Sequence, residues 1–481
     1  MVVVQSALNR TEETSEMITK REHNRGSAKE LPSGFAGQLL APHDADYDDA
    51  RKVYNAMIDR RPALIARCAD AQDVARTIGF AREHHLPLAV RGGGHNGAGL
   101  GICDDGVVAD LSLLREIEVD TKGRTARVGG GCTWGEVDRA THAHGLATPS
   151  GFISTTGVGG LTLGGGIGYL TRRHGLTIDN LLEAELVLAD GTEVRASAQE
   201  NADLFWAIRG GGGNFGVATS FRFALHPVST VLGGPTFWPL EQTHEVMRAY
   251  REFLPGAPRE LNGFLALLTV PPVPPFPEEL HLRKVCGIVW CYLGPAEQAP
   301  DALAPMLKVG EPLMHATGPM SYPDFQSMFD GLYPPGLQWY WRADFVSELS
   351  DRAIECHAQF GARLPTLHST MHLYPIDGAA HDVAPAQTAF SYRDANWAQV
   401  IVGVDPDPAN ADSIRQWTVD YWDATHPYSA GGGYVNFLME EGQDRVRASY
   451  GNNYRRLAEV KAAYDPDNLF HTNQNIAPQA R

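Results

Sequence analysis

The chain has 481 residues, enough for two or three domains of ~100–200 residues each. Its hydrophobic and charged fractions, 43% and 20%, are those of an ordinary globular protein that can bury sizeable cores. The formal net charge of −17 argues against nucleic acid or an anionic membrane as the main partner.

The six cysteines are scattered and form no Cys-x-x-Cys pair, so we expect neither a disulfide framework nor a metal site. No apolar run approaches the ~20 residues of a membrane helix, and the N-terminus lacks a secretory apolar segment. Residues 1–36 are mostly polar and predict a loosely ordered arm. These features predict a soluble, cytoplasmic protein.

The first predicted element after the arm is a helix at residues 70–85. Asp70 can cap its N-terminus, and Val74, Ile78 and Ala81 fall on one face. An amphipathic helix of this kind packs its apolar face against a sheet or another helix.

A glycine-rich loop follows the apolar run 86–90, which itself predicts a buried strand. Six of the ten residues from Gly92 to Gly101 are glycine, and His95 lies among them. Glycine lacks a Cβ and tolerates positive φ, so such a loop can press its amide groups against a bound anion. The loop predicts a diphosphate site with an imidazole beside the ligand. A flexible surface loop with an exposed histidine is the alternative on this stretch alone.

Short strands and a second helix come next. The strands are predicted at 106–111, 117–120 and 125–128. Residues 133–144 predict a helix with Thr133 as its candidate cap and Gly145 as its stop. A hairpin around the Asp190-Gly191 turn follows.

Two further glycine tracts flank this hairpin. Seven of the twelve residues in 157–168 are glycine, which suits backbone that closely approaches another backbone or a flat ligand. Residues 210–216 formally match the dinucleotide fingerprint. We reject a Rossmann site there, because no parallel βαβ unit surrounds the tract and no acidic residue lies near 20 positions on. Residues 217–223 alternate like a strand, so this tract leads into β structure.

The character of the sequence changes near Pro227. Glycine tracts cease, and amphipathic helical stretches such as 242–253 alternate with strands. It changes again near Tyr434, where residues 434–437 are strand-like and residues 454–464 predict a helix. These changes indicate a second domain and a separate C-terminal segment.

Several motifs occur in an order typical of one family. They are Arg91-Gly-Gly-Gly-His95-Asn, Val107-Val-Ala-Asp-Leu-Ser112, Gly157-Val-Gly-Gly160 with Gly164-Gly-Gly-Ile-Gly168, Gly175-Leu-Thr-Ile-Asp179-Asn180, the stretch from Leu204 to Gly216, and Asp465-Pro-Asp-Asn-Leu-Phe470 with Asn475-Ile476. The chain resembles the berberine-bridge-enzyme-like branch of the vanillyl-alcohol-oxidase-type flavoproteins, and within it bacterial members of the 6-hydroxy-D-nicotine-oxidase kind. The resemblance covers residues 40–226 and 430–481, and the middle only in outline.

The resemblance implies an α+β fold. An FAD-binding domain of two subdomains is expected at 37–226, an antiparallel-sheet substrate domain backed by helices at 227–430, and a C-terminal segment returning to the FAD domain at 431–481. The implied activity is that of an FAD-dependent oxidase. It takes a hydride from a small alcohol, amine or sugar-like substrate to flavin N5 and is reoxidised by dioxygen to give hydrogen peroxide. A dehydrogenase with another acceptor and a flavin-binding module without turnover are the alternatives.

The resemblance also assigns cofactor residues. His95 falls on the histidine that bonds covalently to the flavin 8α-methyl group. The other expected FAD contacts are Arg91, Gly92, Gly93, Gly94, Asn96, Thr156, Gly157, Gly159, Gly160, Asn214, Gly216 and Asn475. Thr156 falls where relatives carry the side chain that gates oxygen, and its small size favours an oxidase.

Many relatives carry a second, cysteinyl bond to the flavin. The matching position here is Ile153, whereas Cys132 lies in the wrong motif at the wrong spacing. We therefore expect a single covalent link, and a buried structural role for Cys132.

The catalytic base is not fixed by the resemblance. Carbohydrate-oxidising relatives place a catalytic tyrosine in a Tyr-x-Asn-Tyr stretch, but this chain reads Tyr434-Val-Asn436-Phe437 and lacks that hydroxyl. Either another residue serves or the substrate needs little help from a base. Candidate bases are Tyr434, Tyr374, His372, Glu440 and Tyr450, although a tyrosine or histidine in a strand more often packs as a structural residue with its polar tip satisfied. Phe437, Trp339 and Trp341 are expected to line the substrate pocket.

Overall fold

The computed structural model describes residues 34–479, and the unit Ala36–Arg481 is compact. The arm predicted at 1–36 lies almost wholly outside the described residues. Because the rest forms one compact unit, the segments 37–226, 227–430 and 431–481 stay predictions. Within the described part, no helix is both long and apolar enough to span a membrane.

The first sheet carries the first glycine loop at the end of a strand. It consists of β1 (Gln38–Leu40), β2 (Leu64–Arg67), β4 (Val107–Asp110) and β3 (Leu88–Arg91), hydrogen-bonded in that order, and helix α2 (Tyr47–Ala50) precedes β2. Strands β2, β4 and β3 are parallel, and β1 is antiparallel to β2. Helix α3 (Ala71–Glu83) confirms the first predicted helix. The Asp70 carboxylate accepts a hydrogen bond from the Asp73 amide, and Val74 and Ile78 are fully buried.

The second sheet is antiparallel and lies next to the other two glycine tracts in the chain. Its strands, in hydrogen-bonded order, are β5 (Ile117–Asp120), β6 (Thr125–Gly129), β10 (Val217–Ala224), β8 (Leu181–Val187) and β9 (Glu193–Ser197). The helices of this region are α4 (Trp134–His142), α5 (Val158–Gly164), α6 (Thr171–His174) and α7 (Ala202–Ile208). Thr133 and Glu136 form a capping box at the start of α4, which confirms the predicted cap. The third glycine tract runs into strand β10, as its sequence predicted.

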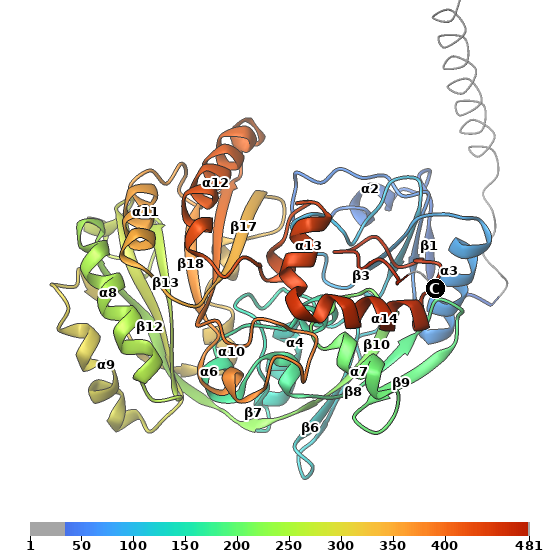
Figure 1. Ribbon diagram of the computed structural model, residues 1–481, viewed down its shortest axis with the longest axis horizontal. Coiled ribbons are helices and arrows are strands. Elements are labelled where there is room, and N and C mark those ends of the chain that lie inside the picture. Colours follow the sequence, from blue (N-terminus) through green and yellow to red (C-terminus); the bar gives the residue numbers. More distant parts are fainter. Residues whose placement is uncertain (1–33, 480–481) are drawn as a thin grey trace, which may run out of the picture. The chain divides into compact units, whose positions relative to one another are not determined.

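The third sheet is the large antiparallel sheet that the resemblance implied. Its order is β15 (Met314–His315), β12 (Thr230–Pro239), β14 (Lys284–Tyr292), β13 (Leu261–Thr269), β18 (Thr370–Pro375), β19 (Trp397–Asp405) and β17 (Gln338–Val346), with β16 (Gly318–Ser321) also paired to β12. The helices in this part of the chain are α8 (Thr243–Phe253), α9 (Ala299–Leu307), α10 (Tyr322–Gln326), α11 (Asp351–Gly361) and α12 (Ala411–Thr425). Figure 1 shows α8, α11 and α12 beside this sheet. A short ribbon of β7 (Leu146–Ala147) and β11 (His226–Pro227) lies just before the change of sheet. The α+β fold is confirmed.

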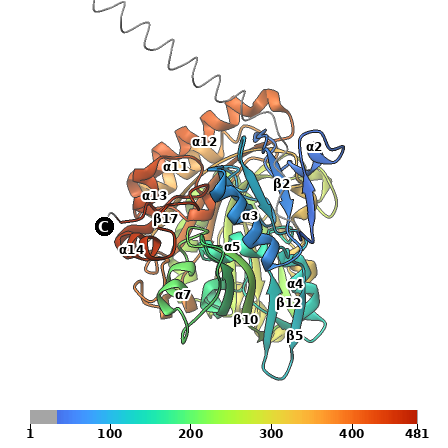
Figure 2. The same ribbon diagram turned by 90° about the vertical axis from the view of Figure 1, so that its right-hand side faces the viewer.

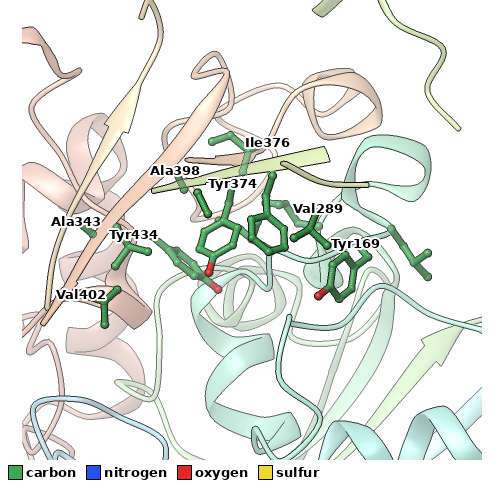
Figure 3. Close-up of a cluster of buried hydrophobic side chains, with 14 of the residues drawn as sticks. Tyr169, Val289, Ala343, Tyr374, Ile376, Ala398, Val402 and Tyr434 are labelled. Carbon is green, nitrogen blue, oxygen red and sulfur yellow. The ribbon is translucent and has the colours of Figure 1, made fainter. Parts of the chain in front are cut away.

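The two faces of the large sheet pack against different partners, because side chains alternate along a strand. Ile401 joins a core cluster with Tyr421 of helix α12. Its neighbours Val400 and Val402 join the cluster on the opposite face, which also contains Tyr434 from outside the sheet. Figure 3 shows part of this second cluster, including Val402 and Tyr434. The face away from the helices is therefore the one that meets the second glycine tract, whose Ile167 joins the same cluster.

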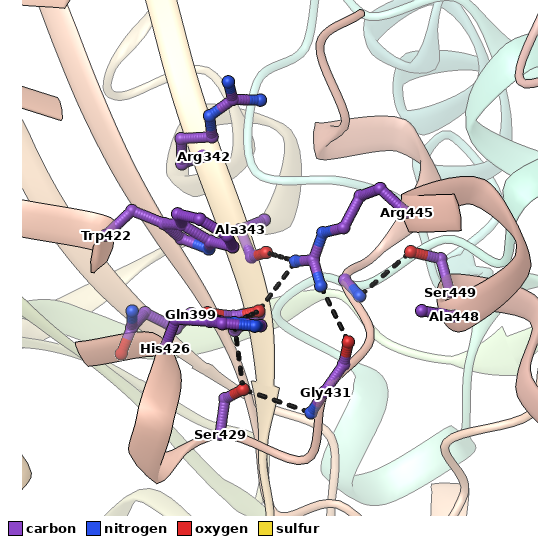
Figure 4. A network of polar contacts seen from close by, with 12 residues as sticks. Arg342, Ala343, Gln399, Trp422, His426, Ser429, Gly431, Arg445, Ala448 and Ser449 are labelled. Carbon is purple, nitrogen blue, oxygen red and sulfur yellow. Dashed lines mark hydrogen bonds and ion pairs between the residues drawn. The ribbon is translucent and has the colours of Figure 1, made fainter. Parts of the chain in front are cut away.

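The C-terminal segment packs into the core of the second sheet. It contains α13 (Gln443–Tyr450) and α14 (Tyr454–Tyr464), and α14 lies beside α7 in both Figure 1 and Figure 2. Arg445 of α13 ties this segment to β17. Its guanidinium donates to the Asp344 carboxylate at 2.6 Å. It also donates to the Gly431 carbonyl at 2.8 Å (Figure 4).

The strand-like prediction for residues 434–437 is wrong. Val435–Phe437 forms a 3-10 turn, η10, in which the Phe437 amide donates to the Tyr434 carbonyl. The Asn436 side-chain amide donates to the Leu161 carbonyl and to the Tyr434 hydroxyl. Aromatic and β-branched residues favour a strand only where a neighbouring strand pairs with them, and here local side-chain bonds compete successfully.

Candidate active site

A large cleft lies where the glycine tracts face the inner side of the large sheet. Its empty volume is about 2040 Å³, part of it open to solvent. Its lining runs from the glycine tracts to strands of the large sheet, so one cleft spans both regions. The predicted site residues that line the cleft are Arg91, Gly92, Gly93, Gly94, His95, Asn96, Thr156, Gly157, Gly159, Gly160, Asn214, Gly216, Trp339, Trp341, Phe437, His372, Tyr374, Tyr434 and Tyr450. Asn475 is not among the lining residues, although Asn473 and Gln474 are.

The first two glycine tracts touch each other backbone to backbone in this cleft. A Cβ added to Gly93 would lie 2.4 Å from the Gly157 amide nitrogen, and one added to Gly157 would lie 2.3 Å from the Gly93 nitrogen. Contacts this short are impossible for side-chain carbons, so both positions require glycine. The pair forms a side-chain-free floor on which a ligand can rest against backbone.

Arg91 is the last residue of strand β3 and lies next to this floor. One guanidinium nitrogen donates to the Asp110 carboxylate at 2.7 Å, and both side chains are buried. The other terminal nitrogen is buried and has no hydrogen-bond partner among the described residues. An unpaired buried donor at a glycine loop suits an anionic ligand such as a diphosphate.

His95 is held in one orientation by two neighbours. Its Nε2 lies 3.0 Å from the Thr155 hydroxyl, and its ring stacks on Tyr54 with centroids 3.9 Å apart. Burial lowers the pKa of His95 to about 4, so the imidazole is neutral near pH 7. No described residue bonds Nδ1, which leaves that nitrogen available to a ligand.

The third glycine tract is joined to the C-terminal segment by a buried lysine. The Lys461 ammonium donates to the Asn214 carbonyl at 2.7 Å, the Phe470 carbonyl at 2.9 Å and the Asp465 carboxylate at 2.6 Å. Asn214 also accepts a hydrogen bond from the Ile476 amide. Loop and tail therefore share one polar core, which fixes the backbone that faces the cleft.

Aromatic rings line the half of the cleft that faces the large sheet. Phe152 stacks on Tyr374 with centroids 4.1 Å apart, and Tyr374 lies 5.9 Å from Phe437. Trp341 follows 6.4 Å from Phe437, and Trp339 lies 5.9 Å from Trp341. The three predicted pocket residues thus form one wall together with Phe152 and Tyr374.

A polar pair lies within this wall on strand β18. The Thr370 hydroxyl donates to the Leu267 carbonyl at 2.9 Å, so its oxygen accepts the proton of His372 Nε2 at 3.0 Å. His372 Nδ1 is then an acceptor, and the Tyr374 hydroxyl donates to it at 2.6 Å. Burial lowers the pKa of His372 to about 3 and raises the pKa of Tyr374. The pair is neutral, and the Tyr374 oxygen keeps lone pairs for another donor.

The other candidate bases are differently placed. The Tyr434 hydroxyl already accepts hydrogen bonds from the Gly166 amide at 2.8 Å and from Asn436 at 2.7 Å. Tyr450 lines the cleft, but its hydroxyl donates to the Gly211 carbonyl. Glu440 is exposed, pairs with Arg60 and does not line the cleft.

Two family models match the chain. One, described as an FAD binding domain, matches residues 62–197, and the other, described as berberine and berberine like, matches residues 433–477. The uncharacterized FAD-linked oxidoreductase YgaK of Bacillus subtilis (strain 168) is 33% identical over 93% of this chain and 98% of that protein. The chain belongs to the berberine-like family of FAD-linked oxidoreductases. It is thus an FAD-dependent oxidoreductase.

Two solved oxidase structures share the fold. The crystal structure of 6-hydroxy-D-nicotine oxidase from Arthrobacter nicotinovorans superposes with a TM-score of 0.84 at 26% identity, over 94% of this chain and 100% of that chain. Glucooligosaccharide oxidase from Acremonium strictum, whose FAD is described as 6-S-cysteinyl and 8α-N1-histidyl, gives a TM-score of 0.81 at 22% identity over 92% and 98%. At that identity the second likeness shows the fold alone.

The cysteines lie away from the cleft surface. All six, which are within the described residues, are free. Cys132 is fully buried with its thiol near the Leu114 and Glu116 carbonyls, burial raises its pKa to about 11, and it does not line the cleft. Ile153 lines the cleft. Between residues 34 and 479, no three His, Cys, Asp or Glu side chains cluster as metal ligands.

Sequence reasoning missed three residues of this site. Tyr54 stacks on His95, Thr155 bonds to it and Phe152 covers Tyr374. Tyr54 belongs to no sequence motif that could have identified it as a residue of this site. Phe152 and Thr155 lie beside Ile153 and Thr156, which were expected at the site, and that position was the one signal for them.

Proposed function

We propose that this berberine-like protein is an oxidase that holds FAD through a single covalent bond to His95 and oxidises a small molecule in the aromatic half of the cleft. One observation carries the proposal: the His95 loop and the His372–Tyr374 pair line the same cleft. Bound FAD would supply a hydride acceptor for the substrate that dioxygen can reoxidise, with hydrogen peroxide as the product. The name of the 6-hydroxy-D-nicotine oxidase relative supports an oxidase.

The surroundings of His95 support its role as the flavin-linking residue. A nucleophilic imidazole must be neutral, and burial keeps His95 in that form with a pKa of about 4. Thr155 occupies Nε2, which directs Nδ1 toward the ligand when Nε2 carries the proton. The single link is supported by the isoleucine at position 153 and by the enclosed thiol of Cys132.

The Arg91 loop and the glycine floor suit the rest of the cofactor. Arg91 offers its unpaired guanidinium nitrogen to the diphosphate. Gly93 and Gly157 let the cofactor approach the backbone, since no Cβ stands between them. Asn214, which is bonded to Lys461 and to the Ile476 amide, supplies a further rigid contact surface for the cofactor.

Tyr374 is the base that the geometry favours among the sequence candidates. Its oxygen can accept the proton of a substrate O–H or N–H while its own proton moves to His372 Nδ1, 2.6 Å away. The Thr370–Leu267 bond fixes the tautomer of His372 that such a transfer needs. Phe437 then serves as wall, which accounts for the absence of a hydroxyl at the position where sugar-oxidising relatives carry theirs.

The test is a reductive titration of the flavin-loaded protein without air. A set of aromatic alcohols, amines and oligosaccharides is screened for loss of the visible flavin absorbance, and air is then admitted. The proposal expects bleaching by at least one compound, fast recolouring in air and one equivalent of peroxide per flavin. Slow recolouring that needs an added acceptor would make the protein a dehydrogenase, and absence of bleaching throughout the set would make it a binding module.

A further inference from the structure

We propose that the aromatic half of the cleft selects a neutral, flat, largely apolar substrate with one O–H group, and rejects both charged compounds and sugars. This inference rests on the proposed function, because it names the substrate class of the same site. It follows from three features of the cleft: its charge, its walls and the state of its polar atoms.

The cleft offers no charge to a substrate. Among the described residues that line it, Arg91 is the one side chain with a permanent charge, and it is paired with Asp110 beside the glycine loop. His95 and His372 are neutral. A buried ammonium or carboxylate without an opposite charge is strongly destabilised, so charged substrates are disfavoured here.

The walls are aromatic and continuous. Phe152 and Tyr374 stack with an interplanar angle of 20°, and Phe437 is tilted by 38° to Tyr374. Trp341 stands edge-to-face to Phe437 at 70°, and Trp339 to Trp341 at 69°. Aromatic rings stack on flat ligands and bury a large apolar area. The wall therefore has the chemistry of a pocket for an aromatic ring system.

Few polar atoms of this wall are free to bind a sugar. The Tyr434 hydroxyl accepts two hydrogen bonds, and the Asn436 amide nitrogen is shared between Tyr434 and Leu161. The indole nitrogens of Trp339 and Trp341 are buried and have no hydrogen-bond partner among the described residues, so these two donors stay open to a ligand. A sugar would leave most of its hydroxyls unpaired on entering, whereas a single O–H finds the Tyr374 oxygen.

An aromatic wall can also attract a cation through its ring faces. The acidic groups that usually accompany such a cage are absent from the described lining, which favours the neutral ligand. The two cases differ in one measurable property, the effect of charge on the affinity of ligands of equal shape.

Calorimetric titration of the flavin-containing protein at pH 7 measures this effect with 2-naphthylmethanol, 2-naphthylmethylamine, 2-naphthoate and cellobiose. We expect 2-naphthylmethanol to bind at least tenfold more tightly than either charged analogue, and cellobiose to give no saturable heat. Equal or tighter binding of the amine, binding of cellobiose, or no saturable binding of 2-naphthylmethanol each overturns the inference.

A matched pair of variants locates the binding. Phe152→Leu keeps an apolar side chain but removes the ring that stacks on Tyr374. We expect this variant to bind 2-naphthylmethanol at least fivefold more weakly than the wild type. Phe253→Leu changes a half-buried phenylalanine of helix α8 outside the cleft lining and should leave the affinity unchanged. An unchanged affinity in Phe152→Leu places the site elsewhere and refutes the inference. The titrations are run without air on protein whose flavin has first been reduced, so the heat reports binding without turnover. Selective binding by a protein whose flavin no compound bleaches would contradict the oxidase proposal alone.

Discussion

The contact between the first two glycine tracts can be tested with one methyl group. In Gly93→Ala the added Cβ would lie 2.4 Å from the Gly157 nitrogen and 2.7 Å from its Cα, whereas ordinary contacts begin at 3.4 Å. The two loops must therefore separate by ~1 Å, and overpacking of this kind costs about 1–3 kcal/mol. Because both atoms belong to backbone, no side chain can turn aside to relieve the contact.

We expect Gly93→Ala to lower the thermal midpoint and to reduce the flavin-to-protein ratio of the purified protein well below that of the wild type. Gly79→Ala is the matched control, since Gly79 lies within helix α3 and an added Cβ would meet nothing within 4 Å. Alanine is the better helix former by about 1 kcal/mol, so the control should keep its flavin and gain slight stability. Wild-type flavin content and stability in Gly93→Ala would refute the close approach of the two tracts.

Three further results are expected. Tyr374→Phe should slow flavin reduction by about 10²–10⁴-fold in anaerobic stopped-flow mixing, the usual contribution of a general base; a rate within threefold of wild type would remove Tyr374 from that role. Lys461→Met leaves the buried Asp465 carboxylate without its ion-pair partner. The free energy of unfolding, measured with denaturant, should fall by about 3–5 kcal/mol, and a decrease under ~1 kcal/mol would contradict the buried pair. Burial lowers the pKa of His357 to about 3, so the unfolded chain alone takes up this proton as the pH falls below 6.5. The free energy of unfolding should therefore fall between pH 6.5 and 3, and fall less steeply in His357→Gln; equal slopes would show that His357 is not buried in its neutral form.

The glycine loops were predictable because their geometry is local to the sequence. Only glycine allows the contact between Gly93 and Gly157, so a dense tract already indicates close backbone approach. The caps at Asp70 and Thr133 were predictable for the same reason, since a capping side chain acts within its own first turn.

The aromatic half of the cleft could be predicted from the sequence only in part. Trp339, Trp341 and Phe437 were expected in the pocket, but their neighbour Phe152 comes from a distant loop and its stacking depends on tertiary packing. His372 and Tyr374 lie two residues apart and share one strand face, but the Thr370–Leu267 bond that orients His372 crosses between strands. Turn η10 was misassigned because its aromatic and β-branched residues find no partner strand among the described residues.

The most direct test of the account is whether FAD is bonded to His95. The protein is precipitated with acid, the colour of the pellet is recorded, and intact masses are measured for the wild type and for His95→Ala. The account predicts a yellow pellet and the added mass of one FAD in the wild type, and neither in the variant. Release of the flavin by the wild type would reduce His95 to a loop residue, and flavin retained by His95→Ala would reveal a second covalent link and contradict the single bond.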